Sequence, residues 1–215
     1  GQFSFPCRKL ADQSRSPAVA TTMYEPFYRY LLQNFPDFQL DPTIFNRYLE
    51  TKVLSKGEIL FQVDDASPSV GFILQGCVRI FIFNQDRERT ISFHTEHDSF
   101  GDFRSFLKQQ PATFNCEAIE PTKALILHRD ALSFLESLPN GNQFLRFHAE
   151  SFAAKMQDKL VSLFLDTPEE RYRHLLATEA DLLARLPNYH LANYLGIQPE
   201  SLSRLKRRLY HQHIS

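Results

Sequence analysis

The stretch that most constrains the fold lies near the end of the chain, at residues 188–207, with the sequence NYHLANYLGIQPESLSRLKR. Gly196 stands where a tight turn requires positive φ. Pro199 can occupy the first turn of a following helix, because the N–H that proline lacks is unpaired there anyway. The seam between two short helices would be filled by Leu191, Ala192, Leu195, Ile197, Leu202 and Leu205. This spacing predicts a helix-turn-helix, a unit that places its second helix in the major groove of DNA.

The distribution of charge agrees with a phosphate-binding surface at this end. Residues 185–215 carry five Lys and Arg against one acidic residue, whereas the remainder carries 19 basic and 24 acidic residues. The formal net charge of −1 therefore conceals a basic end on an acidic body, which is the asymmetry expected of a protein that contacts nucleic acid at one end. The alternative interpretation is an ordinary helical hairpin with a solvated basic face.

Length and composition limit the class of protein. A chain of 215 residues can form one large domain or two modest ones. It has no run of about 18 apolar residues, so we expect no transmembrane span. Cys7, Cys77 and Cys116 match no paired zinc motif and predict no disulfide framework, which indicates a cytoplasmic protein. Residues 1–22 lack the apolar segment of a secretory signal, and we expect a flexible tail, with Met23 as an alternative natural start.

The first half of the chain changes its period after residue 57. Residues 25–35 and 41–50 predict helices, the second with Asp41 as its N-cap and Pro42 in its first turn. Short segments rich in β-branched and aromatic residues then follow at 58–63, 70–74, 77–83, 89–93, 114–118 and 123–128. Roughly eight strands in this region predict an antiparallel sandwich or barrel.

Helical periodicity returns at residue 129. We expect a helix over residues 130–138 and a long one over residues 143–165. Spacings of seven and four residues on the long helix form an apolar seam of Leu145, Phe152, Met156, Leu160 and Phe164. A dimer interface is the preferred interpretation of this seam, and burial within one chain is the alternative.

A new helix is predicted to begin after Asp166, where Thr167, Pro168 and Glu170 have the spacing of a capping box. The core beneath the helix-turn-helix would be filled by Tyr172, Leu175, Leu176, Leu182 and Leu183. The predicted parts are a tail at residues 1–22, a strand-rich domain at 23–139, a long helix at 140–166 and a helix-turn-helix domain at 167–215. This combination is an α+β fold.

In this order of elements, the chain resembles the cyclic-AMP receptor protein/Fnr (Crp/Fnr) family of bacterial transcription regulators over about residues 38–213. The resemblance rests on Gly57, Gly76 and Gly101, on a stretch at 99–118 like the family's phosphate-binding cassette, and on the helix-turn-helix. It implies a cyclic nucleotide-binding-like antiparallel β-roll (a double-stranded β-helix, or jelly roll), a winged-helix-like C-terminal domain and an effector pocket in the roll. It also implies a homodimer paired along the long helix on a palindromic operator in double-stranded DNA, with half-sites about 34 Å apart, and RNA polymerase as a further partner.

The cassette departs from the pattern of nucleotide-binding members. The resemblance assigns the effector pocket to Gly101, Asp102, Phe103, Arg104, Thr113, Lys155 and Met156. Asp102 could accept from a ribose hydroxyl and Thr113 could donate to phosphate, but Ala112 stands where the family has an arginine. Losing that charge-assisted contact costs about 1.5–3 kcal/mol, and Arg104 is the one candidate to replace it in part. Lys155 and Met156 do not match the family's base-contacting residues.

We therefore expect no cyclic AMP binding, no bound cofactor, and either an unidentified effector or none. An iron–sulfur cluster, which some members hold through several N-terminal cysteines, cannot be made by Cys7 alone, and the chain has no recognisable pattern of haem ligands.

On the second helix of the helix-turn-helix, the family's base-reading positions fall on Pro199, Glu200 and Arg204. A glutamate can accept from cytosine N4, and an arginine can donate to guanine O6 and N7. The candidates for phosphate or auxiliary contacts are Gln198, Ser201, Ser203 and Arg207. Few residues follow this helix, so wing contacts are not expected.

Two rival functions remain. A cupin-like metalloenzyme would use His94 and His97, but residues three apart on a strand face opposite sides, and His128 is the only other histidine in the strand-rich region. We therefore predict no metal site and no enzymatic activity. The second rival is a degenerate effector-sensing or protein-interaction module whose helix-turn-helix no longer reads DNA.

Overall fold

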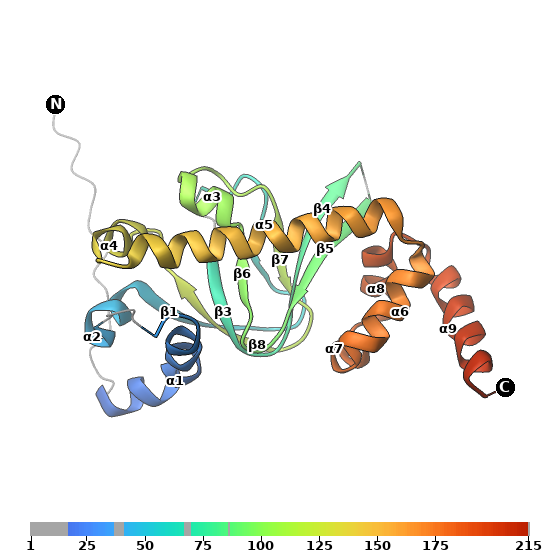
Figure 1. Ribbon diagram of the computed structural model, residues 1–215, viewed down its shortest axis with the longest axis horizontal. Coiled ribbons are helices and arrows are strands. Elements are labelled where there is room, and N and C mark those ends of the chain that lie inside the picture. The colour runs from blue at the N-terminus through green and yellow to red at the C-terminus, as the bar shows by residue number, and fades with distance from the viewer. Residues whose placement is uncertain (1–16, 37–40, 67–69, 86, 215) are drawn as a thin grey trace.

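The computed structural model describes residues 17–36, 41–66, 70–85 and 87–214, and the side chains within residues 24–211 of these ranges. A strand-rich roll lies beside a group of C-terminal helices, and the long helix α5 (Gly141–Leu165) runs from one to the other (Figure 1). Nowhere in these ranges is a helix both long and apolar enough to cross a membrane.

The roll consists of two four-stranded antiparallel sheets. One has the order β1 (Leu49–Leu54), β8 (Thr122–Leu127), β3 (Val70–Gln75) and β6 (Ser99–Gly101). The other has the order β2 (Ile59–Phe61), β7 (Asn115–Ala118), β4 (Val78–Asn84) and β5 (Arg87–His94). Packed together within the roll are the fully buried side chains of Ile73, Val78, Phe100, Cys116 and Ala124. This arrangement confirms the predicted α+β fold with an antiparallel β-roll.

The predicted helix over residues 41–50 is wrong in its second half. Asp41 does cap α2 (Pro42–Phe45), since its carboxylate accepts from the Thr43 N–H at 2.8 Å. The chain then forms the short 3₁₀ helix η1 (Asn46–Tyr48) and enters β1. From Leu49, opposite Leu127, the residues pair with β8. This long-range pairing overrides the local helical pattern.

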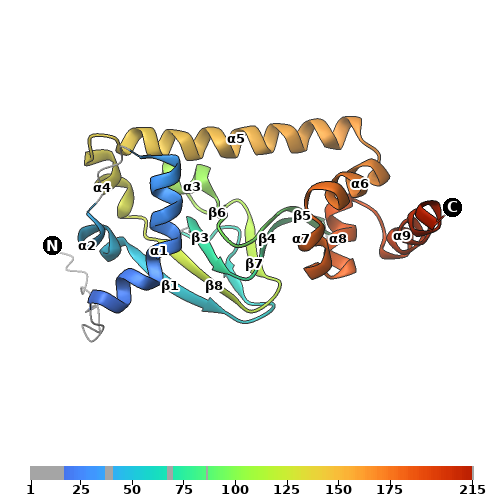
Figure 2. The ribbon, with the colours of Figure 1, turned by 60° about the horizontal axis from the view of Figure 1, so that its bottom comes forward.

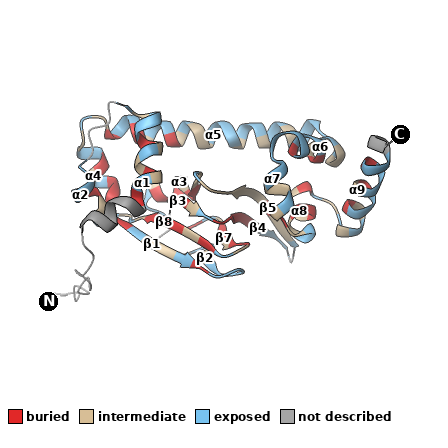
Figure 3. Cartoon of the chain, turned by 90° about the horizontal axis from the view of Figure 1, so that it is seen from below, coloured by how far each residue is buried: buried red, intermediate tan, exposed pale blue. Residues whose placement is uncertain are grey.

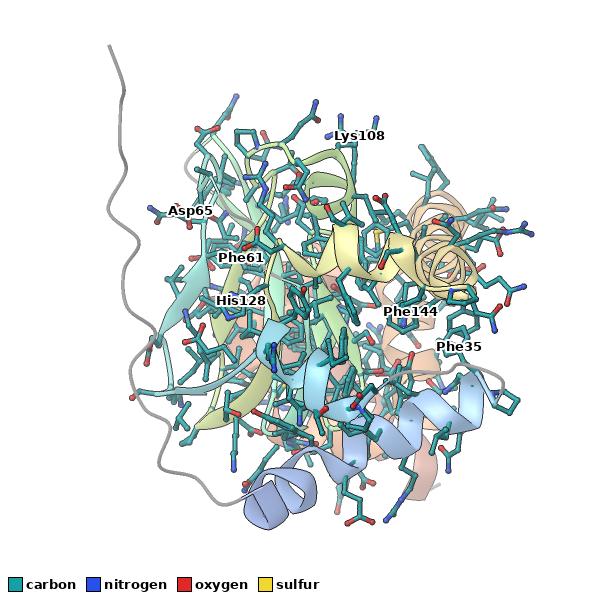
Figure 4. The ribbon with its side chains drawn as sticks, turned by 90° about the vertical axis from the view of Figure 1, so that its left-hand side faces the viewer. Phe35, Phe61, Asp65, Lys108, His128 and Phe144 are labelled. Atoms are coloured by element: carbon teal, nitrogen blue, oxygen red, sulfur yellow. The ribbon has the colours of Figure 1, made fainter. Side chains whose placement is uncertain are left out.

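Three helices cover one end of the roll: α1 (Pro17–Asn34), α4 (Ala131–Ser137) and the first half of α5 (Figure 2). Their aromatic side chains pack on each other, as Phe35 does against Phe144, with ring centroids 5.3 Å apart (Figure 4). The predicted tail over residues 1–22 overlaps α1, which begins at Pro17. Proline is tolerated in a first turn, and the alanines after it favour a helix. Residues 1–16 lie outside the described residues.

The C-terminal unit contains α6 (Pro168–Thr178), α7 (Ala180–Arg185), α8 (Asn188–Leu195) and α9 (Pro199–Ile214). The predicted capping box is present, with both reciprocal hydrogen bonds between Thr167 and Glu170. Tyr172 and Leu175 are buried, but Leu176 is 41% exposed, so its assignment to the core is wrong. Leu176 follows Leu175 directly, and adjacent residues on a helix point about 100° apart.

Candidate nucleic-acid interface and ligand cavities

The turn between α8 and α9 has the geometry that the sequence predicts. Gly196 adopts φ +75°, and the N–H groups of Gly196 and Ile197 donate to carbonyls in the last turn of α8. The seam between the two helices is closed by Leu191, Ala192, Leu195, Leu202 and Leu205. Ile197 is only partly buried at its edge. The pair of helices is therefore fixed by apolar packing, and the polar side of α9 is left for other contacts.

Helix α9 lies at the end of the molecule, away from the roll (Figure 2). Among the predicted contact residues, the exposed ones on α9 are Glu200, Ser203, Arg204 and Arg207, Gln198 is exposed just before the helix, and Pro199 and Ser201 are half-buried. The Arg204 guanidinium donates to Ser201 Oγ at 3.1 Å, within the helix. Arg207 has no hydrogen-bond or ion-pair partner among the described residues. An exposed carboxylate and two exposed guanidiniums on one helix are chemically suited to base edges and phosphates.

Two other basic residues of α9 are held by contacts within the fold. Lys206 Nζ donates to Asn188 Oδ1 at 2.5 Å, and burial lowers the pKa of this lysine. Arg208 forms an ion pair with Glu169 on α6. From the sequence, both residues belong to the basic end of the chain. Their partners lie 18 and 39 positions away, so local spacing does not reveal these contacts.

The C-terminal unit is joined to the roll by a charged cluster that sequence reasoning missed. Arg185, at the end of α7, lies 2.8 Å from Glu96 and also pairs with Glu120. Glu96 Oε1 accepts from the Gly76 N–H at 2.7 Å. Burial opposes ionisation of Glu96, but the hydrogen bonds from Arg185 and Gly76 outweigh it and lower its pKa to about 2. The contact between the C-terminal unit and the roll, here called the joint, therefore consists of ion pairs whose partners are also fixed by hydrogen bonds.

The cassette uses its polar groups internally. Asp102 has no exposed surface and caps α3 (Phe103–Lys108), accepting from the Ser105 N–H at 3.0 Å. Its other oxygen accepts from the Thr113 N–H at 2.7 Å and the Thr113 hydroxyl at 2.6 Å. Ala112 is 2% exposed and belongs to the core of the roll. The two residues predicted to bind ribose and phosphate are thus bonded to each other.

Only some of the predicted pocket residues line a common cavity. A cavity of about 240 Å³ between the roll and α5 is lined by Gly101, Phe103 and Lys155, with His94 and His148 beside them. Arg104 is exposed, and neither it, Asp102 nor Thr113 lines this cavity. Met156 instead lines a larger cavity of about 430 Å³. Three of the seven assignments therefore fall in one place and the other four do not.

Two of the histidines that line the smaller cavity, His94 and His148, have lowered pKa values. Burial lowers the pKa of His94 to about 4, and burial likewise lowers that of His148 to about 4. His94 Nε2 lies 2.9 Å from Ser92 Oγ, while His97 is exposed in a turn with φ +71°. Throughout the described ranges, no group of three His, Cys, Asp or Glu side chains is placed to hold a metal ion.

The apolar seam of α5 divides into two halves. Leu145 and Phe152 pack against the same chain, and the Phe152 ring lies 5.8 Å from that of Phe103. Leu160 is 55% exposed and Phe164 80% exposed (Figure 3). Burial within one chain therefore accounts for the first half of the seam only.

Comparisons with known proteins locate this arrangement among solved folds. Residues 51–136 match the family described as cyclic nucleotide-binding domain. No curated protein sequence matches the chain significantly.

Three solved structures superpose on most of the chain. FixK2 from Bradyrhizobium japonicum is 22% identical with a TM-score of 0.67, over 77% of this chain and 86% of that one. A protein from Eubacterium rectale described as a regulator of the Crp/Fnr family is 16% identical with a TM-score of 0.68, over 86% and 88%. CLP from Xanthomonas campestris, a c-di-GMP-responsive global regulator, is 16% identical with a TM-score of 0.63, over 79% and 90%.

Proposed function

We propose that this chain is a transcriptional regulator that binds DNA through α9. Its residues 51–136 match the cyclic nucleotide-binding domain family, and most of its fold is shared with a solved structure described as a Crp/Fnr regulator. The observation that carries this proposal is the exposed polar side of α9. Glu200, Arg204 and Arg207 face solvent on a helix that the apolar seam with α8 holds in place. Sequence-specific recognition requires such side chains to be both exposed and rigidly carried.

The division of labour along α9 follows from its chemistry. Arg204 would donate to guanine O6 and N7, and Glu200 would accept from cytosine N4. Arg207, Gln198 and Ser203 would contact phosphates or support those contacts, and Pro199 and Ser201 are the half-buried members of the set.

We propose that the protein acts as a homodimer. The second half of α5 exposes five large apolar residues, and these are Leu160, Val161, Leu163, Phe164 and Leu165. Pairing two chains along α5 would bury this surface and set two α9 helices on one palindrome, with half-sites one helical turn apart. Contact with RNA polymerase is a further prediction of the resemblance, and we assign no residue of this chain to it.

We propose that cyclic AMP is not the effector. Asp102 and Thr113 bond to each other, and Ala112, at the position of the family's arginine, is packed in the core, so these three residues do not form a phosphate site. Calorimetric titration of the full chain with cyclic AMP should give no saturable heat. Micromolar binding would overturn this part of the proposal.

The central experiment is selection of bound duplexes from a random DNA library, followed by binding to the selected site. Arg204→Ala should weaken binding by about 1–3 kcal/mol and relax preference at one base pair, whereas Arg207→Ala should weaken all sequences alike. Equal, sequence-independent losses for both variants would contradict base reading by Arg204. Binding without strong salt dependence would instead favour a module that acts by protein contacts.

A further inference from the structure

The larger cavity lies where three parts of the chain meet. Its volume is about 430 Å³, and its walls come from β5, from the second half of α5 and from the helices α6 to α8. These elements lie together at the junction between the roll and the C-terminal unit (Figure 1). This volume falls within the range of small-molecule sites, which are about 300–1,000 Å³. The cavity is distinct from the smaller one beside the cassette, although both reach Lys155 and Phe152.

Two cationic residues of the wall lack a carboxylate partner. Arg171 donates only to backbone carbonyls, at 3.2 Å to Ser162, 2.6 Å to Asp166 and 2.9 Å to Leu195. Lys159 Nζ has no hydrogen-bond partner and lies 3.2 Å from the centroid of the Tyr194 ring. Within the described ranges, no acidic side chain comes within 4.0 Å of either cation. The nearest contacts of the two cations are therefore backbone carbonyls and one aromatic face, although Asp98, Asp158 and Glu179 also line the cavity.

The electrostatics of the pair favour an anion. Burial and, next, the charge of Arg171 together lower the pKa of Lys159 to about 7. A nearby negative charge would stabilise the protonated lysine and offset the repulsion between the two cations. Part of the wall is apolar, formed by Ile91, Phe93, Phe152, Met156, Leu175 and Leu182, and the rest of the wall is polar or charged.

We propose that this cavity binds a small organic anion, a carboxylate or phosphate carried on an apolar body, with Lys159 and Arg171 meeting its charge. Lys159 reaches the cavity by rotation of its terminal side-chain bonds, which exchanges the contact with Tyr194 for an ion pair. The apolar body lies against the aromatic and aliphatic walls. Such a ligand touches the roll, α5 and the C-terminal unit at once, so its binding stabilises their relative placement. An effect on DNA affinity rests on the proposed function, whereas binding of the anion does not.

The test is calorimetry on the full chain with benzoate and phenyl phosphate as probes and benzamide as the neutral analogue of benzoate. We expect one site per chain for at least one anion, with benzamide at least tenfold weaker. Lys159→Met should weaken the anion at least tenfold and leave benzamide unchanged. Lys108→Met, which removes an exposed charge on α3, is the matched control and should change neither. No anion binding up to millimolar concentrations, or equal binding of benzoate and benzamide, would overturn the proposal.

The number of protons taken up when the anion binds is a second measurement, and it would not depend on Lys159 if this lysine had only a structural role. At pH 7.5 Lys159 is largely neutral, and a bound anion that raises its pKa should draw a proton from solution. Titrations in two buffers of different ionisation enthalpy measure that uptake. The other charged or titratable groups on the cavity wall are His94, Asp98, Lys155, Asp158, His174 and Glu179.

We expect uptake to persist in His174→Asn and to vanish in Lys159→Met. Uptake that survives Lys159→Met would assign the proton to another group and overturn the role of this lysine. Because these measurements involve no DNA, their failure is distinct from failure of the proposed function.

Discussion

Helix α9 and the cassette of the roll both carry polar residues that the sequence singles out, but the two regions use those residues in opposite ways. Arg204 and Arg207 project from α9 into solvent, and the packing of α9 depends on other residues. Asp102 is buried and accepts hydrogen bonds from the backbone N–H and the hydroxyl of Thr113. The difference teaches that a motif residue indicates ligand binding only when its polar atoms are not already satisfied by the fold.

The largest expected effect tests the internal role of Asp102. Asp102→Ala should lower the free energy of unfolding by about 3 kcal/mol, because three hydrogen bonds to a buried carboxylate are lost. Urea denaturation followed by circular dichroism measures this value. Asp130→Ala, which removes an exposed carboxylate that makes no capping bond, is the control and should change stability little. A loss below about 1 kcal/mol for Asp102→Ala would remove the contrast with α9.

The second expected effect asks whether the cassette is one residue away from a nucleotide site. Ala112→Arg should cost about 2 kcal/mol of stability, since the longer side chain must enter a packed core. It should also leave the protein without calorimetric affinity for cyclic AMP, because Asp102 and Thr113 remain bonded to each other. Micromolar cyclic AMP binding by a stable Ala112→Arg variant would show that the cassette is open to nucleotides.

Features with short-range chemistry were predictable from the sequence. The caps at Asp41 and Thr167 and the turn at Gly196 depend on residues within a few positions, and all three are present. Strand β1 was missed because its pairing partner, beginning at Leu127 opposite Leu49, lies far along the chain. Local pattern cannot reveal a pairing of that kind.

The sites divide in the same manner. The exposure of Arg204 follows from helical spacing, but the bond between Asp102 and Thr113 requires α3 and the following loop to fold back over eleven residues. The ion pair between Arg185 and Glu96 joins residues 89 positions apart. Lys159 and Arg171 meet at the cavity only because α5 and α6 turn at Asp166. None of these contacts leaves a signal in the spacing of residues.

A smaller effect concerns the joint between the two regions, where Arg185 meets Glu96. The folded pKa of Glu96 is about 2, below its ordinary value of 4.5. The folded state therefore binds this proton less readily than the unfolded state, so the stabilisation is present above pH 4.5 and is lost as the pH falls toward 2.

Glu96→Gln should lower stability at pH 7 by about 1 kcal/mol, because the pair is partly exposed and screened. It should also reduce the acid-dependent loss between pH 4.5 and 2, measured by urea unfolding at several pH values. Glu50→Gln, at an exposed position of β1, serves as the control. An unchanged acid limb in Glu96→Gln would mean that this joint does not contribute to the stability of the fold.

The smallest expected effect compares two residues of α9, one without a partner in the described chain and one already bonded within the fold. Each phosphate contact adds about 0.9 to the magnitude of the slope of log affinity against log salt. Arg207→Ala should reduce that slope by about 0.9 per protomer, because Arg207 has no partner in the described chain. Lys206→Ala should reduce it by less, since the ammonium already donates to Asn188. Fluorescence anisotropy on the selected duplex at several salt concentrations measures both slopes. Equal reductions would show that Lys206 leaves Asn188 for phosphate when DNA binds, and that hydrogen bonds within the free chain do not decide which residues of α9 are available.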